Sequence, residues 1–310
     1  MSGDGAGKRK EAFMNKGTMA DRERKETAIA ATVFLAPALL VIAVFIAYPI
    51  IQSFVTSLYD WNGYSANRVF IGIQNWVTLM KDSQFWAAFR NNILVMVLSI
   101  VIQMPIGMAL ATFLNLVGKK GNICKVIWFI PMLMSSVAIG YLFRYALDPS
   151  TGFVTAISRL FGGGRVDLLG NPKTVLYACI FIIAWQFIPF YMVYYMAGYG
   201  GISGDIHEAA LVDGATEGQY FWQVSLPLLK PSIKSAIVLS IVGSLKYFDL
   251  VYVMTGGGPS GASELMATYM YTKAFNTYQM GYASAVASGM FILISVIAIV
   301  TMRLLNRKED

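Results

Sequence analysis

Long windows without a charged residue recur along this 310-residue chain and restrict what it can fold into. A helix crosses a bilayer with roughly 20 mostly apolar residues, and four windows are longer than that, at 27–59, 91–118, 174–204 and 274–302. A shorter window covers 126–143, and one that begins at Ser235 is interrupted by Lys246 and Asp249. The pattern predicts an all-α polytopic membrane protein with six transmembrane helices, at roughly 29–51, 92–116, 124–145, 175–198, 233–254 and 282–304.

Composition agrees with that interpretation and excludes a nucleic-acid-binding protein. Hydrophobic residues make up 56% of the chain, charged residues 13%, and the mean hydropathy is +0.58. The net charge of +7 comes from basic residues spread around apolar segments, without one basic patch. We therefore expect the lipid bilayer, and no nucleic acid, as the environment of this chain. The first span is expected to be an uncleaved anchor broken by Pro37 and Pro49.

The distribution of Lys and Arg predicts the orientation of the spans. With the N terminus inside, fifteen basic residues near the span ends lie on the cytoplasmic side and seven on the outer side. Both termini are therefore expected to be cytoplasmic. The predicted organisation is a tail at 1–27, a six-span transmembrane domain at 28–305 and a second tail at 306–310, with the loop at 203–231 in the cytoplasm.

That loop is a polar insert in an otherwise apolar chain. It contains Glu208-Ala209-Ala210-Leu211-Val212-Asp213-Gly214 and, further on, Leu226-Pro227. Small alanine side chains let another surface approach closely, and Glu208 offers a charge to a basic partner. The loop is therefore predicted to be a socket for a cytoplasmic protein. The alternative is a solvent-exposed loop in which the acidic residues only keep the surface hydrated and bind no partner.

Local signals in the loop indicate two short helices with a turn between them. Ser203 or Asp205 can cap the first helix, and Thr216 can begin the second. Gly214 tolerates the left-handed backbone conformation that ends a helix. Two prolines, Pro227 and Pro231, are expected to stop the second helix and set its angle to the next span.

The spacing of Glu-Ala-Ala, Gly and Leu-Pro resembles the EAA loop of ABC importer permeases, with Val224 where Ile is usual. The turn Thr255-Gly256-Gly257-Gly258-Pro259 is similar to that of carbohydrate-uptake permeases of the maltose type, which depend on a binding protein. The string Arg90-Asn91-Asn92 also resembles this family, although Asn92 stands where Thr is usual. The resemblance covers nearly everything from about residue 28 to 304.

This resemblance implies a type I ABC importer permease fold and a non-catalytic transport subunit in a bacterial plasma membrane. Its implied partners are a second homologous permease subunit, two ATPase subunits and an extracytoplasmic sugar-binding protein. ATP and Mg would be used by the ATPase, so no cofactor is expected on this chain. The solute would be a sugar, of the di- or oligosaccharide class. The residues implied in coupling to the ATPase are Glu208, Ala209, Ala210, Asp213, Gly214, Leu226 and Pro227.

A solute pathway is predicted on the fourth and fifth spans, where the resemblance also places it. Ser240, Ser244 and Tyr247 share one helical face, and Gly243 beside them leaves room. Aromatic rings and hydroxyl or amide groups are what a sugar needs. The fourth span supplies the same mixture through Trp185, Gln186 and Phe190. Small and hydroxyl residues in spans also serve helix packing, which is the alternative here.

Other functional classes have little support in the sequence. The chain has one histidine, His207, and two separated cysteines, so we expect no metal site and no catalytic residues. It lacks a phosphate-binding loop, so the energy of ATP hydrolysis would have to come from another subunit. An ion-coupled secondary carrier for a small polar solute is the alternative, with Asp249 as its one candidate carboxylate. Lys246 and Asp249 can either neutralise each other or contact solute.

Overall fold

The computed structural model describes residues 27, 30 and 32–306, which form two units divided after Val55. The first unit is one apolar helix, Thr32–Thr56, with none of its most apolar window buried. It includes the π-helical turn η1 (Ala43–Ala47) and α2 (Tyr48–Thr56). The predicted break at Pro37 and Pro49 is wrong, because the helix continues through both. The wider π turn directly before Pro49 gives its ring room that a regular α-helix lacks. The predicted tails lie almost wholly outside the described residues.

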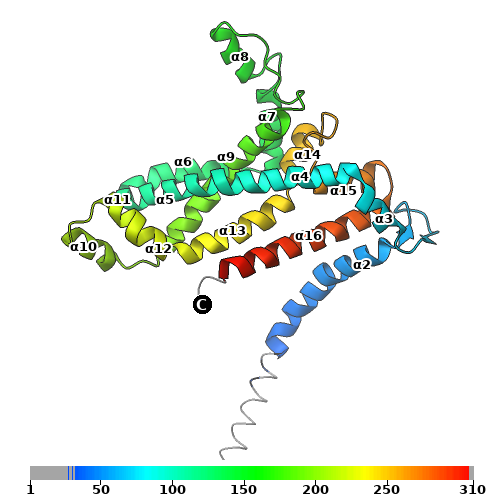
Figure 1. Ribbon diagram of the computed structural model, residues 1–310, viewed down its shortest axis with the longest axis horizontal. Coiled ribbons are helices and arrows are strands. Elements are labelled where there is room, and N and C mark those ends of the chain that lie inside the picture. The colour runs from blue at the N-terminus through cyan, green and yellow to red at the C-terminus, as the bar shows by residue number, and fades with distance from the viewer. Residues whose placement is uncertain (1–26, 28–29, 31, 307–310) are drawn as a thin grey trace, which may run out of the picture. The chain divides into compact units, whose positions relative to one another are not determined.

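The second unit is almost entirely helical (Figure 1). Its one exception to the all-α expectation, among the described residues, is a two-stranded antiparallel ribbon in which Tyr59 pairs with Phe70. Its elements are, in chain order, β1 (Tyr59–Asp60), β2 (Val69–Phe70), α3 (Gln74–Lys81), α4 (Ser83–Leu98), η2 (Ser99–Gln103), α5 (Met104–Val117), η3 (Gly118–Gly121), α6 (Asn122–Leu133), α7 (Ser136–Ala146), α8 (Phe153–Leu160), α9 (Val175–Tyr199), α10 (Gly204–Val212), α11 (Glu217–Tyr220), η4 (Phe221–Ser225), α12 (Leu226–Leu228), α13 (Lys230–Leu245), α14 (Asp249–Thr255), α15 (Met266–Tyr271), η5 (Thr272–Asn276) and α16 (Met280–Asn306).

Five helices of the described chain are long and apolar enough to cross a membrane. Four of the predicted spans in the second unit lie within them, and the helices extend beyond the predicted limits. The span predicted at 92–116 belongs to a helix of 35 residues that also contains α4. The long helices of this unit are Ser83–Val117, Val175–Tyr199, Lys230–Thr255 and Met280–Asn306.

The span predicted at 124–145 is not one straight helix. It consists of α6 and α7, which meet at an angle of 91° across a break at Met134 and Ser135. The buried amide of Gln186, on α9, donates to Ser136 Oγ at 3.0 Å and to the Met134 carbonyl at 3.5 Å. The bond to Met134 partners a backbone carbonyl at the break, and the bond to Ser136 holds the first residue of α7, so a polar side chain on another helix stabilises the bend.

A second break separates α13 from α14, and Asn92 holds it. The side chain of Asn92 is fully buried. Its amide donates to the carbonyls of Ser244 and Leu245, at 3.0 and 3.3 Å, and its carbonyl accepts from the Met266 N–H at 2.8 Å. The last carbonyls of α13 are thereby partnered, which lets the helix end inside the bundle. A polar residue within a predicted span thus fixes where a distant helix ends.

Hydrogen bonds of the Asp82 carboxylate connect the start of α4 to α15 and α16. One carboxylate oxygen caps α4 through the N–H groups of Gln84 and Phe85, and the other accepts from the hydroxyls of Tyr269 and Tyr282. Burial by itself raises the pKa of Asp82, but these hydrogen bonds outweigh it, so the pKa lies below its ordinary value. The ionised form is therefore the one that stabilises the fold.

Candidate functional site

The polar loop folds as the predicted helix–turn–helix. Ser203 caps α10 by accepting from the Asp205 N–H at 3.3 Å. Gly214 ends that helix region with φ of +82°, in the left-handed region. Thr216 then begins α11 with a capping box, in which its hydroxyl accepts from the Gln219 N–H and the Gln219 side chain accepts from the Thr216 N–H.

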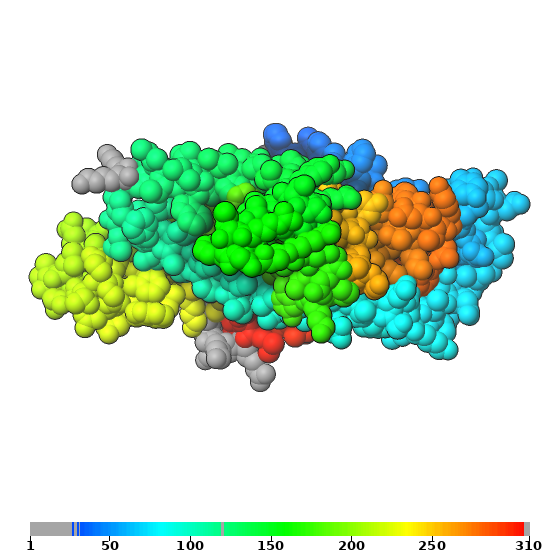
Figure 2. Space-filling view, turned by 90° about the horizontal axis from the view of Figure 1, so that it is seen from above, coloured from blue at the N-terminus to red at the C-terminus, as the bar shows by residue number. Residues whose placement is uncertain are grey.

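The loop projects from the end of the bundle opposite α15 (Figures 1 and 2). Glu208, Ala209, Asp213 and Gly214 are exposed on it, and Ala210 is half-buried. Exposed apolar residues lie among them, with Leu211 46% and Val212 86% accessible. An exposed face that mixes apolar side chains and carboxylates is the composition of a protein-docking surface. The remaining two residues of the predicted coupling set, Leu226 and Pro227, lie beyond α11 on the way to α13.

The prediction that Pro227 and Pro231 stop the second helix is wrong. Helical backbone continues from α11 through η4 and α12 into α13, with a single turn residue, Leu229. Pro231 lies in the first turn of α13, after the turn residue Leu229, where a missing N–H costs nothing, whereas Pro227 lies inside the continuous helix just after the π-helical turn η4. The loop is therefore joined to the apolar span by nearly continuous helix.

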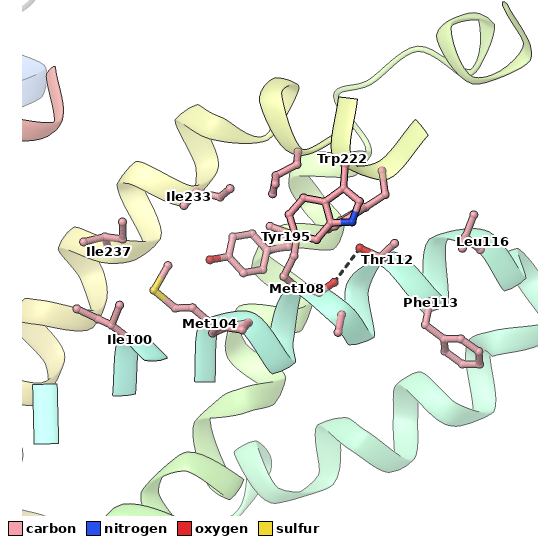
Figure 3. A pocket seen from close by; sticks show the side chains of 14 residues that line it. Ile100, Met104, Met108, Thr112, Phe113, Leu116, Tyr195, Trp222, Ile233 and Ile237 are labelled. Carbon is pink, nitrogen blue, oxygen red and sulfur yellow. Dashed lines mark hydrogen bonds between the residues drawn. The ribbon is translucent and has the colours of Figure 1, made fainter. Parts of the chain in front are cut away.

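An apolar groove of about 760 Å³ lies where this segment meets the spans (Figure 3). Phe221, Trp222 and Leu226 of the segment line one part of it. The other parts come from α5, α9 and α13 and include Met108, Tyr195, Ile233 and Ile237. Displacement of the second half of the loop must therefore change contacts with three membrane helices.

A smaller cavity of about 260 Å³ lies among η2, α9 and the α13–α14 break. The predicted fifth-span residues Ser240, Gly243, Ser244 and Tyr247 all line it. Ser240 Oγ is buried near the Tyr191 hydroxyl and makes no hydrogen bond of ordinary geometry among the described residues. An unpartnered buried hydroxyl is costly, and a polar guest in the cavity would remove that cost.

The predicted residues of the fourth span lie elsewhere. The Trp185 ring packs edge-to-face on Phe143, and Phe190 stacks on Tyr194. Gln186 sits behind the cavity wall, where it accepts from the Tyr247 hydroxyl at 3.4 Å. The side chains that α9 contributes to the cavity are instead Ile183, Phe187 and Tyr191.

Ser99 and Gln103 also line this cavity and were not predicted. Both are buried on η2, and the Gln103 amide donates to Ser99 Oγ at 3.0 Å. The signal available in the sequence was an amide inside an otherwise apolar window. The π-helical turn that carries these residues is a common feature of functional segments in helices.

Lys246 and Asp249 both line the cavity, at the break between α13 and α14. No ion pair joins them in the part of the chain that the structure describes. Of the two alternatives, mutual neutralisation is therefore not observed. The cavity has an ammonium and a carboxylate in its lining, together with hydroxyls, amides and aromatic rings.

Long apolar helices around a cavity with polar and charged side chains in its lining, and an exposed helix–turn–helix at one end, define the class of this protein: a helical membrane subunit of a transport system. Comparison with known proteins gives the family. Residues 103–310 match the model of the family described as binding-protein-dependent transport system inner membrane component, and the chain belongs to that family. This confirms the predicted relationship to ABC importer permeases, and with it the expectation of a transport subunit without catalytic activity.

Relatives along most of the chain carry related names. The probable ABC transporter permease YurN of Bacillus subtilis is 33% identical, over 89% of this chain and 96% of its own length. The multiple sugar-binding transport system permease MsmF of Streptococcus mutans is 30% identical, over 89% of this chain and 95% of its own length. The trehalose/maltose transport permease MalF of Thermococcus litoralis is 29% identical, over 88% and 92%.

Solved structures agree with this assignment. A bacterial ABC transporter that imports the acidic polysaccharide alginate superposes with a TM-score of 0.78 at 25% identity, covering 94% of this chain and 99% of that one. The alginate transporter in complex with its pentasaccharide-bound periplasmic protein gives 0.76 at 26% identity, over 93% and 95%. The importer permease fold is therefore shared along nearly the whole chain.

Proposed function

We propose that this chain is the membrane permease subunit of an ATP-driven importer for a sugar, and that it contributes both to the solute pathway and to the contact with the ATPase. The proposal rests on the presence of two candidate sites in this one chain. A cavity lined in part by hydroxyl, amide and charged side chains lies between the spans, and an exposed helix–turn–helix is joined to the same spans by nearly continuous helix.

The lining of the cavity suits a carbohydrate. Ser240 and Ser244 supply hydroxyls, Gln103 supplies an amide, and the rings of Tyr247 and Phe187 supply faces for the apolar side of a pyranose. Related permeases are named for multiple sugars and for trehalose and maltose, and the alginate importer has the same fold. We infer that the solute is a di- or oligosaccharide whose sugar units pass through this cavity one after another.

Coupling would proceed through the loop. In the predicted orientation, with both termini cytoplasmic, α10 presents Glu208 and its alanines to an ATPase subunit that binds ATP and Mg. Closure of the ATPase dimer would move α10 and α11, and the apolar groove at Phe221 and Trp222 would transmit that movement to the spans. A second homologous permease subunit, two ATPase subunits and an extracytoplasmic sugar-binding protein complete the assembly.

One observation favours a second candidate, an ion-coupled carrier. Asp249 lines the cavity without an ion pair to Lys246 in the described chain, and carriers use such carboxylates for protons or sodium ions. The two candidates differ in their energy source. A carrier takes up solute without ATP, whereas an importer subunit does not.

Reconstitution in proteoliposomes tests the proposal. The variant Glu208→Lys reverses a charge on the proposed docking face, and Asp60→Lys reverses one at the opposite end of the bundle. We expect Glu208→Lys to lower co-purification of the ATPase subunit and sugar uptake per ATP hydrolysed, and Asp60→Lys to leave ATPase co-purification unchanged. Uptake by this chain alone without ATP, or wild-type coupling in Glu208→Lys, would overturn the proposal.

A further inference from the structure

The one histidine of the chain joins the two helices of the loop. His207, on α10, places Nε2 at 3.2 and 3.3 Å from the two carboxylate oxygens of Glu217, on α11. Its ring also packs on Tyr220, with the centroids 4.5 Å apart. Tyr220 is buried at the end of α11, directly before η4. No role for His207 was predicted from the sequence.

The connection that these contacts span is short and turns at a glycine. The chain between α10 and α11 includes Gly214, whose φ is positive and where a Cβ would have no neighbouring atom within 4 Å. Backbone bonds from Gly214 and Ala215 return only to α10, to Leu211 and Ala210. They stabilise the turn itself, and the contacts of His207 with Glu217 and Tyr220 join the two helices across it.

We infer that His207 and Glu217 form a cross-helix pair that makes α10 and α11 move as one body, so that displacement of the docking face reaches η4 and the spans. His207 is thus a positioning residue for coupling, acting through Glu217 and Tyr220. This inference rests on the proposed function of the loop. It adds a requirement for the pair itself, beyond the residues that face the ATPase.

The exposure of the pair limits how large its effect can be. The side chains of His207 and Glu217 are 33% and 48% accessible, and surface pairs contribute little to global stability. A small interaction is sufficient here because it biases the angle between two short helices and not the folding of the bundle. The expected consequence is partial uncoupling with intact assembly.

The experiment compares sugar uptake per ATP hydrolysed in proteoliposomes that carry the full assembly. We expect His207→Ala and Glu217→Ala each to lower this ratio about threefold to fivefold, with ATPase co-purification within twofold of wild type. The double variant should be no worse than either single variant, because both remove the same pair. His207→Gln, whose amide can still donate to Glu217, should retain most of the coupling.

The exchanged pair, His207→Glu with Glu217→His, is the decisive variant, and Gly218→Ala on α11, where an added Cβ has no neighbour within 4 Å, is its control. The exchange should restore the ratio to within twofold of wild type, and the control should leave it unchanged. Wild-type coupling in His207→Ala, additive losses in the double variant, or an exchange as impaired as the single variants would each overturn the inference. If Glu208→Lys lowers the ratio while these variants do not, the inferred role of the His207–Glu217 pair is wrong and the proposed function of the loop stands. If Glu208→Lys is also fully coupled, the proposed function of the loop fails.

Discussion

Replacement of Gly214 isolates the backbone conformation that the proposed coupling loop requires. Gly214 has φ of +82°, and no neighbouring atom lies within 4 Å of an added Cβ. Gly218, on α11, is equally open but has no positive φ. Substitution at Gly214 therefore costs only backbone strain, about 1–2 kcal/mol for a residue such as alanine. At Gly218 an alanine should instead favour the helix by about 0.5–1 kcal/mol.

This strain should weaken binding of the ATPase subunit. A loss of about 1–2 kcal/mol lowers the fraction of loops in the docking geometry, and the apparent Kd rises by up to about 5-fold to 30-fold. The measurement is a titration of the ATPase subunit against detergent-solubilised permease heterodimer. We expect Gly214→Ala to raise the apparent Kd, Gly214→Asn to raise it less because asparagine tolerates positive φ, and Gly214→Val to raise it most.

Gly218→Ala is the matched control and should leave the apparent Kd at or slightly below the wild-type value. Equal values for Gly214→Ala and Gly218→Ala would refute the argument that positive φ matters. An order of effects that follows side-chain size at both positions would instead assign the loss to steric contact with the partner.

Other predictions concern the cavity, the bend, the start of α4 and the orientation. Gly243→Phe should fill the cavity and abolish sugar uptake with ATPase co-purification unchanged, whereas Gly243→Ala should transport normally, since an added Cβ there has no neighbour within 4 Å; transport by the phenylalanine variant would remove the cavity from the pathway. Gln186→Leu leaves the α6–α7 break unpartnered at a cost of about 1–3 kcal/mol, and an unchanged melting temperature would contradict that role. Because the pKa of Asp82 is lowered in the folded state, its contribution is present above about pH 4 and is lost as pH falls below it; Asp82→Asn should lower the melting temperature at pH 7 and reduce the loss on acidification, and a wild-type pH profile of the melting temperature would be inconsistent with this. In intact cells an impermeant thiol reagent should label a cysteine at Gly163 but not one at Thr216, and the opposite pattern would exclude cytoplasmic termini.

The fourth span shows why cavity residues could not all be predicted. Helix α9 is apolar around its whole circumference, so its periodicity does not indicate which face meets the cavity. Trp185 and Phe190 were chosen by residue type, yet Phe187 and Tyr191 face the cavity. In the fifth span, hydroxyl groups at i, i+4 and i+7 mark one face, and this shared face of Ser240, Ser244 and Tyr247 does line the cavity.

The sequence by itself determined the existence of the long helices and the form of the polar loop at 203–231, because both depend on local interactions. Inside a bilayer each backbone group must be partnered within its own helix, so long charge-free windows predict helices directly. The capping of α11 by Thr216 and the turn at Gly214 are likewise settled within a few residues.

The tertiary structure alone decided where helices bend or end inside the bundle. The break before Ser136 depends on the amide of Gln186, and the end of α13 depends on Asn92, both far away in the chain. The pairing of His207 with Glu217 likewise appears only when α10 folds back on α11. These features arise where a polar group finds its partner on another helix, and no local pattern in the sequence specifies which helix that is.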